Sequence, residues 1–494
     1  MLLNSIVQGL EFDTIKGDLN KEISTLSYDS KEVMENSIFV AISGFAVDGH
    51  QFIDKAIEQG ASTIILEKDM LIEQDVTVLK VINSRDALAR VSANFYQNPT
   101  EKLNLVGITG TNGKTSSSYF IQSIFEQAKQ STGLIGTIGT LINNKLVKNK
   151  NTTPESLNLQ STFSEMTNEK VDNCIMEVSS HSLNLKRVAY SNFNTGIFTN
   201  LTPDHLELHN NMDDYFEAKA ELFDLTKDFN IINVDDKYGR RLINRVKDYE
   251  TTLVTFGLEH KADIYPTDIH YSFDKTTYTV NTPSGSVKVA VNIPGKIYVY
   301  NSLAAIACAY CNGISLEDIR YGIQNVKGIK GRLETIYKEE EYKVIVDFSH
   351  TEDALEQALK TIRPYVKGKL ILVFGVYADE SDKGREKRDG MSRAASTFAD
   401  FSVVTSDNPK TFDPLMIVQD ISQAMDRYNG KYKTILDREK AIQHAIEISE
   451  KDDTILIAGK GHETTQKVGN LEIPFDETKI ALEALQEKKQ FVEL

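Results

Sequence analysis

Short apolar runs alternate with amphipathic stretches along most of this 494-residue chain. Near the N-terminus, the apolar runs 37–42 and 62–66 predict strands, and residues 52–60 between them have the spacing of an amphipathic helix. From about residue 333 the same rhythm returns, with apolar runs at 343–347, 369–374, 402–405 and 454–458. Strands that alternate with helices favour parallel sheets, so the chain is predicted to be an α/β protein.

The middle of the chain adds an antiparallel element to this pattern. Buried strands are predicted at 173–178, 195–199 and 229–234. Residues 260–293 differ, because 276–280 alternate in polarity and the turn Thr282-Pro-Ser-Gly285 follows, which predicts a hairpin. Asn98-Pro99 marks a boundary before the middle region.

A glycine-rich segment, Gly107-Ile-Thr-Gly-Thr-Asn-Gly-Lys-Thr115, lies between an apolar run and a helical stretch that ends near Ala128. Strand, glycine turn and helix together are typical of a phosphate-binding loop, in which backbone N–H groups and the positive helix end meet the phosphates. In such a loop Lys114 would reach the β- and γ-phosphates and Thr115 would hold Mg²⁺. The alternative is a glycine turn without a ligand.

Polar clusters follow three of the predicted C-terminal strands. They are Asp347-Phe-Ser-His350, Ser406-Asp-Asn-Pro-Lys410 and Gly459-Lys-Gly-His-Glu463. Open parallel sheets bind ligands beyond the carboxyl ends of their strands. We therefore expect a ligand cleft between two α/β domains.

Composition and charge exclude several classes of protein. Hydrophobic residues make up 40% and charged residues 26% of the chain, as in soluble globular proteins. The net charge of −16 argues against a nucleic-acid or membrane-surface binder. No signal peptide or membrane span is expected, and three cysteines fit a reducing cytoplasm. Cys308 and Cys311 have redox-motif spacing, but their apolar surroundings favour packing in a buried helix.

Three further residues have competing interpretations. Glu177 ends a predicted strand, where a carboxylate can hold Mg²⁺ or simply accept a hydrogen bond. His205 is either a metal or phosphate contact or a structural histidine. Lys219 lies in a helical segment, where a solvated lysine is the ordinary expectation.

Taken together and in order, the motifs resemble the Mur ligase family, in particular its members that add the third residue of the peptidoglycan stem peptide. The resemblance covers essentially the whole chain. It rests on Asp29-Ser-Lys31, Asp48-Gly-His50, Gly107–Thr115, Asn151-Thr-Thr-Pro154, Glu177-Val-Ser-Ser-His181, Asn200–Leu206, Lys219, Tyr300–Ala305, Gly331-Arg332, Asp347–Leu355, Asp407-Asn-Pro409 and Gly459–Glu463.

This resemblance implies three domains: a UDP-substrate domain (1–98), a central P-loop-type ATPase (99–331) and a doubly wound amino-acid domain (332–494). The implied ATP contacts are Gly110, Thr111, Asn112, Gly113, Lys114, Thr115, Ser116, Asn301, Arg332 and Asp347. The implied Mg²⁺ neighbours are Thr115, Glu177, His205 and Lys219, and Lys114, Lys219 and His205 are the implied catalytic residues. The implied substrate contacts are Ser30, His50, Asn151, Thr152, Thr153, Ser179, Arg187, Asp407, Asn408, Lys410, Gly459 and Glu463.

Lys219 matches the carbamylated lysine of the family. A neutral amine that adds CO₂ becomes an anion, which is able to ligate a second Mg²⁺. The implied reaction converts UDP-MurNAc-L-Ala-D-Glu and ATP to an acyl phosphate, which the amine of a free amino acid then attacks. The resemblance implies a cytoplasmic enzyme, and we expect a monomer.

The chain departs from the family in the amino-acid site. Relatives that use diaminopimelate have Arg where this chain has Lys410, whereas Gly459 and Glu463 resemble the diaminopimelate type. Arginine grips a carboxylate with two donors, while lysine offers a point charge. Relatives also have an arginine where Ser381 stands. The sequence therefore predicts a diamino acid without naming it.

Two other functions are compatible with the motifs. The first is a ligase of the same superfamily with another acyl substrate, such as a folate polyglutamate enzyme. The second is a non-catalytic, nucleotide-binding paralogue. The uridine-type first region and Asn151-Thr-Thr-Pro154 argue against the first, and Lys114, Glu177, His205 and Lys219 argue against the second.

Overall fold

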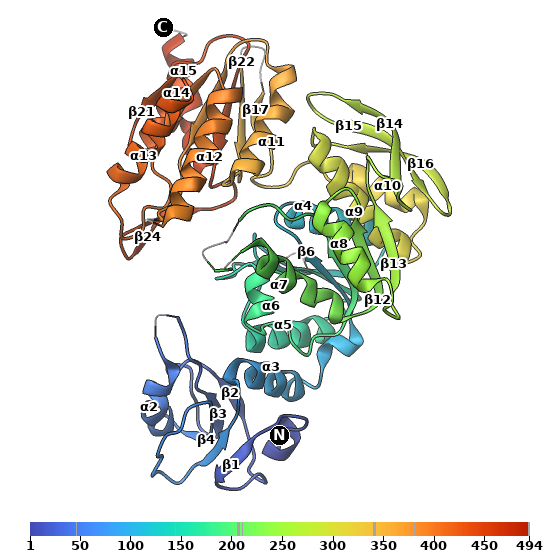
Figure 1. Ribbon diagram of the computed structural model, residues 1–494, viewed down its shortest axis with the longest axis vertical. Coiled ribbons are helices and arrows are strands. Elements are labelled where there is room, and N and C mark those ends of the chain that lie inside the picture. The colour runs from blue at the N-terminus through green and yellow to red at the C-terminus, as the bar shows by residue number, and fades with distance from the viewer. Residues whose placement is uncertain are drawn as a thin grey trace.

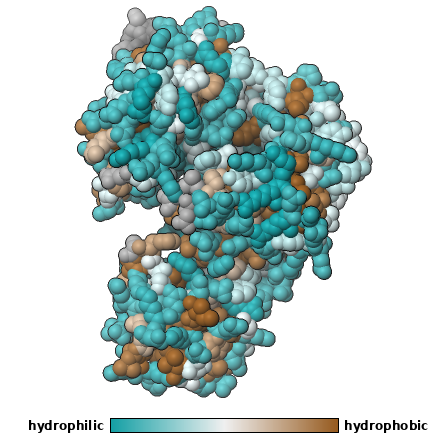
Figure 2. All heavy atoms as spheres, in the orientation of Figure 1, coloured by the Kyte–Doolittle hydropathy of each residue, from teal (hydrophilic) through white to brown (hydrophobic). Residues whose placement is uncertain are grey.

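The computed structural model describes residues 1–45, 47–143, 145–204, 208–209, 211–338, 342–379 and 381–492. Three groups of elements follow one another along the long axis of the molecule, each built on its own main sheet (Figure 1). The N-terminal group lies at one end, the C-terminal group at the other, and the middle group between them. The surface is strongly polar and is indented between the two end groups on the face shown in Figure 2.

The N-terminal sheet has the order β1-β5-β4-β3-β2. Its strands are β1 (Asp13–Lys16), β2 (Thr25–Ser27), β3 (Ser37–Val40), β4 (Ala61–Leu66) and β5 (Thr77–Lys80), and only β1 pairs antiparallel. The helices are α1 (Leu3–Ile6), η1 (Gly49–Phe52), α2 (Ile53–Glu58) and α3 (Ser84–Phe95). The helix expected over 52–60 is thus confirmed as α2, preceded by the single turn η1.

The middle sheet has eight strands in the order β13-β12-β11-β6-β10-β7-β8-β9. They are β6 (Asn104–Thr109), β7 (Thr132–Ile135), β8 (Thr140–Ile142), β9 (Lys145–Val147), β10 (Asn173–Glu177), β11 (Phe193–Phe198), β12 (Thr226–Asn233) and β13 (Thr252–Phe256). The helices around them are η2 (Pro99–Lys102), α4 (Lys114–Gln127), α5 (Ser156–Asn168), α6 (Ser180–Asn184), α7 (Met212–Asp224) and α8 (Lys237–Val246). The strands from β13 to β7 run parallel, and the β8–β9 hairpin extends one edge antiparallel.

A three-stranded antiparallel sheet confirms the change of pattern at residues 260–293. It contains β14 (Tyr265–Tyr271), β15 (Thr276–Thr282) and β16 (Gly285–Val291). The helices α9 (Lys296–Cys311) and α10 (Leu316–Asn325) then pack against α4. The approach of α10 is very close, because a Cβ added at Gly322 would lie 2.5 Å from Ile124 Cα. Cys308 is buried within α9, as the sequence predicts.

The C-terminal sheet has the order β17-β18-β22-β19-β20-β21. Its strands are β17 (Glu334–Lys338), β18 (Tyr342–Asp347), β19 (Leu370–Phe374), β20 (Phe401–Val404), β21 (Tyr432–Thr434) and β22 (Asp453–Ala458), with a separate hairpin of β23 (Thr465–Val468) and β24 (Leu471–Pro474). The helices are α11 (Glu352–Ile362), η3 (Arg363–Tyr365), α12 (Asp382–Phe398), α13 (Pro414–Arg427), α14 (Arg438–Glu447) and α15 (Glu477–Val492). Within the six-stranded sheet only β17 pairs antiparallel, so the four parallel strands predicted from the sequence are confirmed.

The parallel strands β18, β20 and β22 bring their carboxyl ends to one edge of the C-terminal sheet. The three polar clusters predicted from the sequence follow these ends directly. Over the ranges that the structure describes, no helix combines the length and the apolar character needed to cross a bilayer.

Candidate functional site

The glycine-rich loop connects β6 to α4, as its sequence predicts. Gly110 and Gly113 both adopt positive φ, at 143° and 90°. A Cβ at Gly110 would collide with Thr199 Oγ1, and one at Gly113 with Asn301 Oδ1. Glycine is therefore required at both positions, by conformation and by space. The loop exposes its backbone to the cavity in front of α4, which is the arrangement that binds phosphate.

Lys114 begins α4 and turns its ammonium back over the loop. Nζ donates to the carbonyl oxygens of Gly110 and Thr111 at 2.8 Å each. Burial lowers the pKa of Lys114, and the negative charges of Glu177 and Asp204 oppose that effect. The ammonium thus lies within the loop that would cradle a phosphate chain.

Thr115 and Glu177 form the candidate magnesium contact. Thr115 Oγ1 lies 3.0 Å from each carboxylate oxygen of Glu177, which is buried at the end of β10. Thr137 donates to the same carboxylate through its backbone N–H and its hydroxyl, at 3.0 Å each. A hydroxyl and a carboxylate at a phosphate loop are oxygen ligands of the kind that Mg²⁺ prefers. These residues therefore fit a nucleotide-bound Mg²⁺.

Lys219 is buried within α7, with 1% of the residue exposed. Nζ donates to the carbonyl of Gly110 at 3.0 Å and lies 4.6 Å from the ring centre of Tyr215. Burial, and then the charge of Lys114, hold the pKa of Lys219 well below its usual value. Lys219 is therefore not the solvated helix lysine that its local sequence suggests, and its burial disfavours the charged ammonium.

The C-terminal group closes the cavity from the other side. Arg332 Nη2 donates to Thr115 Oγ1 at 3.2 Å, and its guanidinium stacks 4.5 Å from the ring centre of Phe348. Asp347 accepts hydrogen bonds from the backbone N–H groups of Leu333 and Ser349, at 2.7 and 2.8 Å. These contacts position the Asp347 carboxylate at the mouth of the cavity.

The cavity itself has a volume of about 270 Å³. Its lining includes, of the sequence-predicted residues, Thr111, Asn112, Gly113, Lys114, Thr115, Ser116, Thr152, Glu177, Ser179, Asn301, Arg332 and Asp347. Gly110 and Lys219 lie directly behind this lining, joined by the Lys219 hydrogen bond. His205 lies outside the described residues. Among the described residues, at this site or elsewhere, no group of three or more His, Cys, Asp or Glu residues is arranged to hold a metal ion.

The remaining contacts predicted for the acyl substrate lie toward the N-terminal group. Thr153 Oγ1 donates to the carbonyl of Glu177 at 2.9 Å, and Arg187 Nη1 donates to the carbonyl of Thr153 at 3.1 Å. Arg187 and Arg85 of α3 each lie 3.3 Å from the Glu155 carboxylate, which links the two groups of elements.

Three predicted substrate residues have different surroundings. Asn151 is exposed, whereas Ser30 is buried, with 7% of the residue exposed. His50 is buried too, and its ring lies 2.7 Å from the Asp48 carboxylate. Ser30 and His50 belong to the N-terminal group, and neither these two residues nor Asn151 lines the cavity over the phosphate loop.

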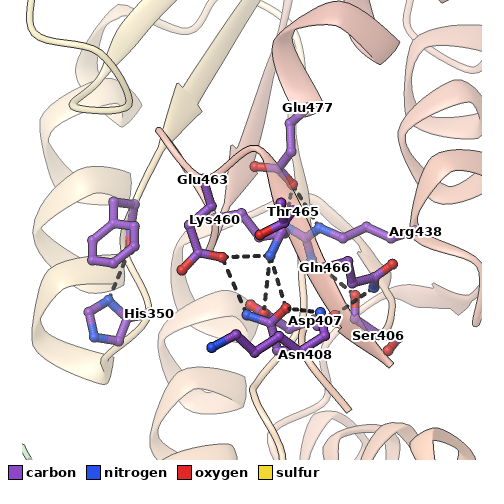
Figure 3. A network of polar contacts seen from close by, with 12 residues as sticks. His350, Ser406, Asp407, Asn408, Arg438, Lys460, Glu463, Thr465, Gln466 and Glu477 are labelled. Carbon is purple, nitrogen blue, oxygen red and sulfur yellow. Dashed lines mark hydrogen bonds and ion pairs between the residues drawn. The ribbon is translucent and has the colours of Figure 1, made fainter. Parts of the chain in front are cut away.

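The acceptor residues predicted in the C-terminal group converge beyond β20 and β22 (Figure 3). Asp407 and Gly459 approach each other so closely that a Cβ at Gly459, where φ is 125°, would lie 2.9 Å from Asp407 Oδ2. Lys410 is exposed, with φ of 54°, and its Nζ lies 5.3 Å from the ring centre of Tyr377. Glu463 lies beside Asn408, whose Nδ2 donates to Glu463 Oε2 at 3.3 Å.

A buried ion pair holds the two acceptor loops together. Arg438, at the start of α14, lies 2.6 Å from Glu477 at the start of α15, and both side chains are fully buried. The same guanidinium donates to the backbone carbonyls of Ser406 and Ala458, at 3.3 and 2.8 Å. Ser406 follows β20 and Ala458 ends β22, so a single arginine links the strand ends from which the two acceptor loops leave.

Sequence reasoning missed several residues that shape the site. Thr137 clamps Glu177, and Lys387 of α12 lies 3.5 Å from Asp204 and 4.2 Å from the ring centre of Tyr377. Lys460 is buried between Asn408 and Glu463. The sequence signal for Lys460 is its place inside the Gly459–Glu463 motif, whereas the partners of Thr137 and Lys387 are distant in sequence.

Three family models match this chain between residues 22 and 461. Residues 22–96 match the Mur ligase family, catalytic domain; residues 108–309 match the Mur ligase middle domain; residues 331–461 match the Mur ligase, glutamate ligase domain. A UDP-N-acetylmuramoyl-L-alanyl-D-glutamate--2,6-diaminopimelate ligase from Alkaliphilus metalliredigens (strain QYMF) is 42% identical over 99% of this chain and 98% of that protein. The ligase of the same name from Clostridioides difficile (strain 630) is 42% identical over 98% of this chain and 99% of that protein.

Solved structures have the same architecture. A structure of a UDP-N-acetylmuramoyl-L-alanyl-D-glutamate--2,6-diaminopimelate ligase superposes with a TM-score of 0.70 at 28% identity, covering 99% of both chains. The MurF ligase of Thermotoga maritima, determined in complex with ADP, has a TM-score of 0.62 at 17% identity, covering 94% of this chain and 98% of that one, and so shares the fold. The family models and the full-length relatives agree with the phosphate loop, the strand-end clusters and the three sheets: the chain belongs to the Mur ligase family.

Proposed function

We propose that this chain is the ATP-dependent ligase that joins 2,6-diaminopimelate to the D-glutamate of UDP-MurNAc-L-Ala-D-Glu. The observation that carries the proposal is the convergence of Lys114, the Thr115–Glu177 pair and Arg332 on one cavity between the middle and C-terminal groups. Full-length relatives named for this reaction support the choice of substrates. The acyl phosphate route needs ATP and the acyl substrate to meet in such a cavity.

The proposal divides the chain into three domains with separate tasks. Residues 1–98 would bind the UDP end of the substrate, with Ser30 and His50 near the uridine. Residues 99–331 would bind ATP, and residues 332–494 the free amino acid. Reactants held by three domains meet only when these domains are close together, so we also propose that binding draws the domains together. The enzyme would act as a cytoplasmic monomer.

Residues of this chain would stabilise the negative charge that develops during phosphoryl transfer. Lys114 and Arg332 would face the negative charge that develops as the γ-phosphate moves to the D-glutamate carboxylate. Thr115 and Glu177 would hold Mg²⁺, which would supply further positive charge at the phosphate oxygens. His205 would stand near the same ion.

A carbamate on Lys219 is the final part of the proposal. The buried, low-pKa amine supports it, because CO₂ adds to a neutral amine. Lys219→Ala should therefore lose activity that short-chain carboxylates partly restore, since a free carboxylate replaces the missing anion. Full activity of Lys219→Ala without added carboxylate would contradict the carbamate.

The decisive experiment is phosphate release with ATP, Mg²⁺ and UDP-MurNAc-L-Ala-D-Glu, screened across meso-diaminopimelate, L-lysine, ornithine and the common amino acids. We expect release with diaminopimelate and a product of matching mass. If phosphate were released only with a different amino acid, the proposed acceptor would be wrong but the proposed ligase reaction would stand. No release with any acceptor, together with tight nucleotide binding, would favour another acyl substrate or a non-catalytic role.

A further inference from the structure

Lys460 is a fully buried lysine at the centre of the acceptor loops. It follows β22, and its side chain has no exposed surface. Figure 3 shows its ammonium between Asn408 and Glu463, with Asp407 below. A charged lysine is almost never fully buried without partners, so the contacts of this ammonium need to be accounted for.

The ammonium has partners in both acceptor loops. Nζ donates to Glu463 Oε2 at 2.6 Å and to Asn408 Oδ1 at 3.1 Å, and it lies 4.0 Å from Asp407 Oδ1. Lys460 therefore lies beside two carboxylates, both of which also influence the pKa of Arg438. Its own hydrogen bonds reach only one of these carboxylates, that of Glu463, and the Asn408 amide.

These hydrogen bonds fix the orientation of the Asn408 amide. Oδ1 receives two donors, the Lys460 ammonium at 3.1 Å and the backbone N–H of Lys467 at 2.9 Å. An amide nitrogen cannot accept these hydrogen bonds, so the oxygen must face Lys460. The Nδ2 group then donates to Glu463 Oε2 at 3.3 Å, the same oxygen that Lys460 contacts. Lys460 and the Lys467 backbone N–H thus hold the Asn408 amide with its donor group beside Glu463.

The same hydrogen bonds involve only one of the two carboxylate oxygens of Glu463, among the contacts of the described residues. Oε2 receives both Lys460 and Asn408. Among the described residues no hydrogen bond to Oε1 is found, and the Glu463 side chain is 34% exposed. An ammonium of the acceptor would therefore meet Glu463 at the single oxygen Oε1.

We propose that Lys460 is a positioning residue that sets the choice of acceptor amino acid. This inference rests on the proposed function. By holding Asn408 Oδ1 and Glu463 Oε2, Lys460 leaves the second N–H of Asn408 Nδ2 for a carboxylate and Glu463 Oε1 for an ammonium. The site then favours an amino acid with both groups on its distal carbon, as in diaminopimelate, over one with an ammonium alone, as in lysine.

The test compares steady-state constants for meso-diaminopimelate, L-lysine and ATP in the wild type and in Lys460→Met. We expect the KM for diaminopimelate to rise on the order of tenfold to hundredfold, as for groups that orient a direct ligand contact. The KM for ATP should change by less than about twofold, because the phosphate loop keeps its own contacts. The preference for diaminopimelate over lysine should fall with the same substitution.

A double-mutant cycle separates positioning from general support of the fold. If Lys460 acts through Glu463, Lys460→Met/Glu463→Gln should raise the KM for diaminopimelate no more than Glu463→Gln alone. Lys460→Arg keeps the charge but changes the donor geometry, and should lose part of the acceptor preference even if Lys460→Met does not fold. The matched control is Lys488→Met, which removes three hydrogen bonds to Ile446 and Ser449 in the same sheet group. Lys488→Met should leave the KM values for diaminopimelate and lysine unchanged.

Two results would overturn the inference while the proposed function stands. One is an unchanged diaminopimelate KM in both Lys460 variants, and the other is an equal rise in the constants for ATP and for diaminopimelate. A wild-type protein without acceptor-dependent phosphate release would instead overturn the proposed function, and this inference with it.

Discussion

Lys387 of α12 and Asp204 of the middle group lie 3.5 Å apart, and both side chains are largely buried. Asp204 also lies close enough to Lys114 and Lys219 to influence the pKa of both lysines. On its other side Lys387 contacts the ring of Tyr377, which in turn lies under Lys410. One ammonium therefore stands between the phosphate loop and the acceptor loops.

Lys387→Met should weaken the link between the two halves of the site. We expect kcat/KM for the acceptor to fall roughly 2- to 30-fold, which corresponds to a coupling of about 0.5–2 kcal/mol. Steady-state kinetics measures the change. Lys360→Met is the control, because Lys360 pairs with Glu356 on an exposed helix face of the same sheet group and should have no kinetic effect. Equal kinetics for the two variants would contradict the link.

Thr137→Val should raise the requirement for Mg²⁺. The substitution keeps the shape of the side chain but removes the hydroxyl that donates to Glu177 Oε2 at 3.0 Å. The Mg²⁺ concentration for half-maximal activity should rise on the order of tenfold, as when a supporting hydrogen bond to a metal ligand is lost. Thr140→Val is the matched control, since its hydroxyl donates to Asn149 instead. A rise of the same size in both variants would argue against the role of Thr137.

Lys219→Met should stabilise the protein at neutral pH when CO₂ is excluded. Burial lowers the pKa of Lys219, so the ammonium is favoured in the unfolded chain and penalised in the folded one. The unfolded state then binds more protons, and the stability of the wild type rises with pH up to the ordinary lysine pKa. The advantage of Lys219→Met should shrink over that window. Urea unfolding at pH 7 and near pH 10 measures it, and an advantage that grows with pH would contradict the assignment.

Gly322→Ala should destabilise the packing of α10 on α4. The added methyl group would lie 2.5 Å from the Cα of Ile124, where backbone must move. Such overpacking costs about 1–3 kcal/mol of the free energy of unfolding. Gly328→Ala is the control, because no heavy atom lies within 4 Å of its added Cβ. Urea midpoints compare the two variants, and a loss confined to Gly328→Ala would disprove the packing argument.

The sequence predicted the parts of the site that depend on local pattern. An apolar run, glycines and a helix predicted the β6–α4 loop, because each of these signals lies within a few residues of the next. The polar clusters after β18, β20 and β22 could also be predicted to lie together, because parallel strands bring their carboxyl ends to one edge of the sheet.

Contacts between distant segments could not be predicted in this way. Thr137 lies 40 residues from Glu177, and Lys460 lies 52 residues from Asn408, so no periodicity relates the partners. The burial of side chains could not be predicted either. The helical pattern around Lys219 is that of a solvated lysine, and nothing in the sequence indicated that Lys460 would be fully buried. The pKa of Lys219 follows from its burial and not from its helix.

The Arg438–Glu477 pair determines which residues of the acceptor site can be substituted during evolution. Arg438 donates hydrogen bonds to the backbone carbonyls of Ser406, which follows β20, and Ala458, which ends β22. Every residue type offers the same carbonyl, so the side chains at these two positions can be replaced without removing the hydrogen bonds. Arg438 and Glu477 cannot be replaced one at a time without destabilising the protein, because the remaining charge would be buried without its partner. A new acceptor preference is thus reachable through substitutions in the loops, on an anchor that stays fixed.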